Sequence, residues 1–309
     1  MTEINELFEK RTIFPDVDAK SRLSRLVGMD ERKLMLTKII GLLVNPTGLT
    51  NWLDKKHPDA YFLAEAVLRR PPLIILAGDV GSGKSELAET IGDAVARQEN
   101  IEITLLPMSL STRGQGRVGE MTQLVTAAFD TTLAEASKLK SIGSSSRGAV
   151  ILLIDEADAL AQSREASQMH HEDRAGVNAF IRGIDRIAQG QLPAAVIMCT
   201  NRLNALDPAI RRRAAEIVTF QRPTLEQRAH LLNHLLKPAG LSTNDILDLA
   251  RITGNSDDRN FGFTFSDISQ RLIPSIVLDA YPNGTISASR AKEIASAMVP
   301  TKPFVEESI

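Results

Sequence analysis

The chain has 309 residues, of which 43% are hydrophobic and 24% are charged, and its formal net charge is −2. This composition is typical of a soluble globular protein, and the near-neutral charge argues against general nucleic-acid binding. The single cysteine excludes a disulfide framework and a cysteine-rich zinc site. Because the N-terminus is charged and no apolar run approaches ~18 residues, we expect a cytoplasmic protein without a membrane span.

Up to about residue 220, short apolar runs alternate with longer helical patterns. The runs are aliphatic or β-branched on both faces, which is typical of strands in a buried parallel sheet. We therefore predict an α/β fold with a central parallel sheet flanked by helices. The predicted strands are 73–77, 101–106, 149–154, 194–199 and 216–220, and the predicted helices include 85–98 and 173–188.

After Pro223 the pattern becomes helical throughout. Thr224 and Gln227 have the spacing of a capping box, which predicts a helix start. Further helices are predicted at 243–252, 265–280 and 287–298. The predicted organisation is an N-terminal arm at 1–20, a large α/β domain at 21–222 and a small helical domain at 223–309.

The turn between the first strand and its helix fits the phosphate-binding pattern GxxxxGK[ST]. Its glycines allow backbone N–H groups to surround a phosphate at the start of a helix. Lys84 would reach the β- and γ-phosphates, and the Ser85 hydroxyl would bind Mg²⁺. The turn reads Gly78-Asp79-Val80-Gly81-Ser82-Gly83-Lys84-Ser85.

A second signal is the strand 149–154, which ends in Asp155 and Glu156. At the carboxyl edge of a parallel sheet, Asp155 can hold the Mg²⁺ shell while Glu156 polarises a water for attack on the γ-phosphate. Acids also favour a helix start, so a solvated first turn is the alternative. The apolar lead-in and the position downstream of the phosphate turn favour an ATP hydrolysis site.

A third signal follows strand 194–199. The amide of Asn201 is suited to orient the attacking water, and three consecutive arginines occur ten residues later. A guanidinium suits the charge of a transferring phosphoryl group and often acts on a neighbouring subunit's nucleotide. The alternative for Arg211, Arg212 and Arg213 is a helix end or a solvated surface.

These residues together resemble the AAA+ ATPases over about residues 25–300. The resemblance implies a hexameric ring with ATP at the subunit interfaces, Val27 and Gly28 beside the adenine, and Asn201 as sensor 1. It favours Arg212 and Arg213 as the arginine fingers. The segment 262–268 is similar to the start of the family's lid helix, although Phe265 and Ser266 replace the usual Gly-Ala.

Within that family, the stretches "GRVGEMTQLVTAAFD" and "RAGVNAFIRGIDRI" look most like the pachytene-checkpoint ATPases. That resemblance implies a HORMA-domain protein as the substrate and, for bacterial relatives, a role in nucleotide-second-messenger defence against phage. Only ~20 residues precede the ATPase core, so we expect the substrate to be engaged without an adaptor domain.

The stretch 114–119 fits the dinucleotide pattern GxGxxG, but the acidic residue at about the required distance, Glu135, lies in a helical pattern and no strand lies between. The resemblance to the AAA+ ATPases places residues 116–119 at the first pore loop, with Arg117 and Val118 where most relatives carry an aromatic–apolar pair. We expect these two residues to contact the substrate; an irregular surface loop is the alternative. His230 and His234 lack the glutamate of a metalloprotease helix, so a surface pair is favoured over zinc.

Three other functions stay open at this level. A Rubisco-activase-like remodeller shares the weakly aromatic pore loop. A nucleic-acid loader is disfavoured by the net charge, and an ATP-gated scaffold by the complete set of hydrolytic residues.

Overall fold

The computed structural model describes residues 7–60, 62–110, 120–140, 146–160, 171–256 and 260–303. The chain divides into two compact units, each described by itself. Among the described residues, the first unit holds those up to Arg25, Glu31–Ala77 and Ser85–Thr219. The second holds Leu26–Asp30, Gly78–Lys84 and the residues from Phe220 on. The domain boundaries expected from the sequence stay a prediction.

The predicted α/β fold is confirmed, and the sheet predicted to be parallel is mostly parallel. Six strands lie in the order β1-β3-β4-β5-β2-β6, with β3, β4, β5 and β2 running parallel. The strands are β1 Thr12–Phe14, β2 Leu73–Gly78, β3 Glu102–Ser109, β4 Gly148–Asp155, β5 Ala194–Thr200 and β6 Ala214–Phe220.

Two strands differ from the expectation, β1 at the edge of the sheet and its neighbour β3. Residues 12–14, which lie in the predicted arm, form β1 and pair antiparallel with β3. Strand β3 also continues past Pro107 to Ser109. The Pro107 carbonyl accepts a hydrogen bond from the Glu9 N–H at 3.0 Å, so the proline faces the β1 side. Its missing N–H therefore leaves the ladder to β4 intact.

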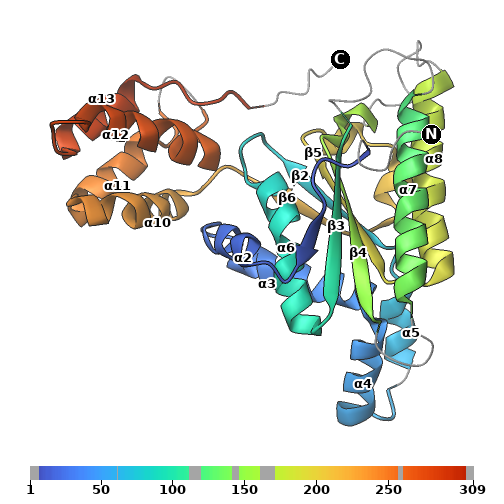
Figure 1. The fold of residues 1–309 in the computed structure, drawn as a ribbon. Helices are drawn as coiled ribbons and strands as arrows, with labels where there is room; N and C mark the ends of the chain where they lie inside the picture. Colours follow the sequence, from blue (N-terminus) through green and yellow to red (C-terminus); the bar gives the residue numbers. More distant parts are fainter. Residues whose placement is uncertain are drawn as a thin grey trace. The chain divides into compact units, whose positions relative to one another are not determined.

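Helices cover both faces of the sheet. In Figure 1, α7 and α8 lie side by side on one face, with α2, α3 and α6 on the other. Phe129 of α7 and Phe180 of α8 meet edge to face, with ring centroids 5.5 Å apart. The helices of this unit are α2 Val17–Ser24, α3 Asp30–Val44, α4 Pro46–Lys56, α5 Phe62–Leu68, α6 Lys84–Glu99, α7 Glu120–Leu139, α8 His171–Gly190 and α9 Pro208–Arg211. Within the described ranges, no helix is long and apolar enough to cross a bilayer.

The second unit is a helical bundle around its own core, which includes the fully buried Phe263 and Leu272. The predicted capping box is confirmed: the Thr224 and Gln227 side chains each accept from the other residue's backbone N–H. The predicted helix 265–280 contains a π-helical segment at Asp267–Leu272, directly before α12. The α-helices are α10 Leu225–Leu236, α11 Thr243–Ile252, α12 Ile273–Ala280 and α13 Ala288–Ala297.

Candidate functional site

The phosphate loop follows directly from β2, and its shape requires glycine. Gly78, Gly81 and Gly83 have φ values of 141°, 70° and 92°, which side-chain-bearing residues rarely adopt. A Cβ at Gly78 would lie 2.1 Å from the Phe220 carbonyl oxygen. The glycines of the sequence pattern therefore correspond to real backbone constraints.

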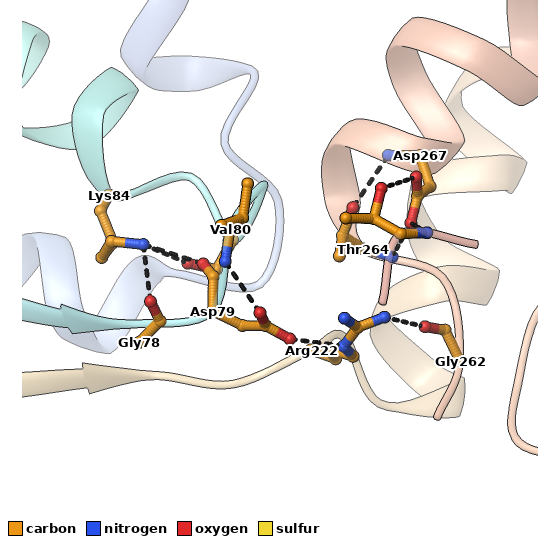
Figure 2. A network of polar contacts seen from close by, with 10 residues as sticks. Gly78, Asp79, Val80, Lys84, Arg222, Gly262, Thr264 and Asp267 are labelled. Carbon is orange, nitrogen blue, oxygen red and sulfur yellow. Dashed lines mark hydrogen bonds and ion pairs between the residues drawn. The ribbon is translucent and has the colours of Figure 1, made fainter. Parts of the chain in front are cut away.

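The positive charge of the loop is the ammonium group of Lys84. Lys84 begins α6 and is 6% exposed; its Nζ donates to the carbonyl oxygens of Gly78 at 2.9 Å and Asp79 at 2.8 Å (Figure 2). The neighbouring Ser82 is buried, and Ser85 follows in the first turn of α6. An ammonium held by loop carbonyls beside a helix N-terminus is suited to bind an anionic ligand.

Val27 and Gly28 belong to the same unit as the phosphate loop. Val27 packs against the core of the helical bundle. Gly28 has a φ of 71°, and its carbonyl accepts from the Gln227 side chain at 2.9 Å. The segment predicted to contact the adenine is thus fixed to the start of α10.

The acids at the end of β4 are held by the strand beside it. The Glu156 backbone N–H donates to Asp155 Oδ1 at 2.8 Å, and Ser109 Oγ donates to Glu156 Oε2 at 2.7 Å. Ser109 is the last residue of β3 and stands in register with Asp155. Glu156 has a φ of 51°, a strained backbone conformation that recurs at functional sites. The exposed Glu156 carboxylate is therefore fixed in direction by its backbone and by Ser109.

Asn201 is held by Asp158, a residue for which the sequence offered no role. Asp158 Oδ1 accepts from Thr200 Oγ1 at 2.5 Å and from the Asn201 backbone N–H at 2.8 Å. Its Oδ2 accepts from Asn201 Nδ2 at 3.1 Å. Ser109 and Asp158 share a signal that sequence reasoning missed: both are polar residues beside the carboxyl ends of strands that are neighbours in the sheet.

The three arginines after β5 have different surroundings. Arg212 is exposed. Arg213 makes a two-pronged ion pair with Asp185 of α8, with Nε–Oδ1 and Nη2–Oδ2 distances of 2.8 and 3.1 Å. The hydrogen bonds that Arg213 donates to Asp185 raise the pKa of Arg213 above its ordinary value. The Nε atom of Arg211 is buried without a hydrogen-bond partner. Arg212 is thus the arginine of the three that is presented to solvent.

Two further predictions concern the pore-loop residues and the histidine pair. Arg117 and Val118 lie outside the described residues. His230 and His234 are both exposed on α10. Over the described part of the chain, no group of three or more His, Cys, Asp and Glu residues is placed to hold a metal ion.

A phosphate loop after β2, paired acids after β4 and a polar amide after β5 define a P-loop ATPase. Residues 74–222 match the family model for the ATPase family associated with various cellular activities (AAA). The chain is 64% identical to "CD-NTase-associated protein 6" of Escherichia coli strain MS 115-1, over 98% of this chain and 97% of that protein.

Solved structures agree with this match. One chain of a HORMA:CdnC:Trip13 complex from E. coli MS115-1 is 64% identical, with a TM-score of 0.88, covering 96% of this chain and 97% of that one. A Rhizobiales Trip13 structure is 55% identical, with a TM-score of 0.75, covering 96% and 100%. The chain therefore belongs to the CD-NTase-associated protein 6 family of Trip13-like AAA ATPases.

Proposed function

We propose that this ATPase uses hydrolysis to remodel a HORMA-domain protein and so regulates an anti-phage signalling complex. The observation that carries the proposal is the 64% identical chain found in a complex with HORMA and CdnC. The identity extends over nearly the whole length of both chains, so it includes the helical unit as well as the sheet.

We assign the triphosphate to the loop 78–85. Its support is the left-handed glycines, the buried ammonium of Lys84 and the helix start at the same point. Backbone N–H groups of Asp79 to Ser85 would surround the phosphates, and Lys84 would reach the β- and γ-phosphates. Val27 and Gly28 would line the adenine side.

We assign catalysis to the residues at the carboxyl ends of β4 and β5. Ser85 and Asp155 supply the hydroxyl and carboxylate oxygens that Mg²⁺ prefers, and this donor set fits the ion. When bound, Mg²⁺ would neutralise charge on the phosphate oxygens. Glu156 would accept the proton of the attacking water, and Asn201, held by Asp158, would orient that water.

We further propose that the chain acts as a hexameric ring in which Arg212 and Arg213 complete a neighbour's site. The exposure of Arg212 supports it as the arginine that crosses an interface. Arg213 would stabilise the same surface through Asp185. Arg117 and Val118 stay proposed substrate contacts in the pore, and the cytoplasmic location stays a prediction.

Mixed rings test the assignment of Arg212. Arg212→Ala and Lys84→Ala should each be inactive alone, because one lacks the finger and the other the phosphate cation. A mixture should recover measurable phosphate release, because some interfaces combine an intact Lys84 with an intact Arg212. Recovery in the mixture supports action between subunits; an Arg212→Ala protein with full activity contradicts it.

A trapping experiment tests the substrate. Glu156→Gln should hold ATP without turnover and retain a purified HORMA-domain protein from the same genome in a pull-down. Lys84→Ala, which should not load ATP, is the matched control. Retention by both variants or by neither would contradict an ATP-dependent grip on a HORMA domain.

A further inference from the structure

The phosphate loop contains a carboxylate. Asp79 Oδ1 accepts from the Val80 backbone N–H at 2.9 Å, while the carbonyl of Asp79 accepts from Lys84 Nζ at 2.8 Å. An acid is therefore built into the loop that we assign to a triphosphate. Like charges in a partly buried setting repel more strongly than in water, so this carboxylate by itself would oppose phosphate binding.

Arg222 compensates that charge. It lies just after β6, and its Nε donates to Asp79 Oδ2 at 2.7 Å. The side chains of Arg222 and Asp79 are only 14% and 16% exposed. The ion pair is thus shielded from solvent. Salt and water weaken a shielded ion pair less than an exposed one.

The guanidinium is fixed from a second direction. Its Nη1 donates to the Gly262 carbonyl at 2.5 Å, and its central carbon lies 5.1 Å from the centroid of the Phe261 ring. Figure 2 shows Arg222 between Asp79 on one side and Gly262 on the other. The side chain is therefore held in one orientation toward the loop rather than sampling solvent.

We propose that Arg222 is a positioning residue for ATP: it neutralises and anchors Asp79, so that the phosphate loop accepts a highly charged ligand. This inference rests on the proposed nucleotide site. The competing explanation is that Arg222 only holds the loop in shape. Another segment beyond β6 holds the loop in this way, because the Ser266 backbone N–H donates to the Gly81 carbonyl at 3.1 Å. The two explanations differ in how the loss depends on charge.

Titrations of the full chain with fluorescent, non-hydrolysable ATP and with fluorescent ADP and AMP separate them. Arg222→Gln should weaken ATP binding about tenfold, or roughly 1.4 kcal/mol, with a smaller loss for ADP and a still smaller loss for AMP. The double variant Asp79→Asn/Arg222→Gln should restore ATP affinity to within about twofold of wild type. Asp79→Asn alone should bind ATP more tightly, since the arginine then faces the phosphates uncompensated.

Equal losses for the three nucleotides, or a double variant as weak as Arg222→Gln, would overturn the proposal. Weaker ATP binding by Asp79→Asn would do the same, and this variant decides the question if Arg222→Gln does not fold. Arg290→Gln is the matched control, because it removes an arginine whose partners are Asp279 and Glu293. Failure of the wild type to bind ATP, or binding by Lys84→Ala equal to wild type, would instead refute the nucleotide site itself.

Discussion

The acids at the end of β4 take their partners from neighbouring strands of one sheet, whereas the phosphate loop takes its partners from the segments beyond β6. Glu156 is held by Ser109 of β3, and Asp158 by residues at the end of β5. The loop is held by Arg222 and by the backbone of Ser266. The positions of these acids thus depend on neighbouring strands, and the shape of the loop depends on the segments that follow β6 in its own unit.

This difference predicts a separation of effects. Changes at Glu156 and Asp158 should lower kcat and leave nucleotide affinity intact. Changes in the segments beyond β6 should alter nucleotide affinity first. A variant in either group that lowered kcat and nucleotide affinity equally would contradict this separation.

The largest effect is expected at Glu156. Glu156→Gln should lower the rate of phosphate release at least ~100-fold, because the water loses its base, while ATP affinity is retained. Glu102→Gln is the matched control and should behave as wild type. Glu102 is the first residue of β3, at the end of the strand away from Ser109, which holds Glu156. Near-normal hydrolysis by Glu156→Gln would remove Glu156 from this role.

A smaller effect on kcat is expected at Asp158. Asp158→Asn should lower kcat about tenfold, because its new amide N–H₂ opposes the donor of Asn201. The double variant with Asn201→Ala should be no slower than Asn201→Ala alone, since both changes act through one amide. Additive losses, measured as single-turnover rates, would show that Asp158 does not act through Asn201.

The smallest effect on nucleotides is expected at Asp267. Its side chain is 1% exposed and accepts from Thr264, Thr301 and Arg271, which fixes the turn that packs against Gly81. Asp267→Asn should change ATP affinity by no more than about threefold. It should also destabilise the fold by about 2 kcal/mol at pH 7 through lost charge-assisted hydrogen bonds.

The stability effect of Asp267 should depend on pH. Burial raises its pKa, but the hydrogen bonds from Thr264, Thr301 and Arg271 outweigh burial, so the pKa lies below the ordinary value. The stabilisation is therefore complete above an unfolded pKa of about 4 and is lost as the pH falls through the lower folded pKa. The difference in thermal unfolding between wild type and Asp267→Asn should shrink below about pH 4. A constant difference across that range would contradict this account.

The parts of the fold that sequence could predict are those with local causes. The apolar runs predicted five strands, and Thr224 with Gln227 predicted the start of α10. Strand β1 has only three residues, too few to show a period, and forms because β3 offers an open edge. The continuation of β3 past Pro107 depends on which side the proline faces, which sequence does not show.

The residues of the candidate site also fall into two groups, those that the sequence could predict and those that it could not. Lys84, Asp155 and Glu156 belong to contiguous motifs whose chemistry is visible in the sequence. The roles of Ser109, Asp158 and Arg222 depend on chain segments that meet only in the fold. Arg222, for example, lies 143 residues from its partner Asp79.

The most direct test of the central claim is steady-state phosphate release as a function of the concentration of a HORMA-domain protein from the same genome. We predict a saturable rise in turnover for the wild type and none for Glu156→Gln. Wild-type turnover that stays the same at every concentration of the HORMA protein would contradict the coupling of hydrolysis to this substrate.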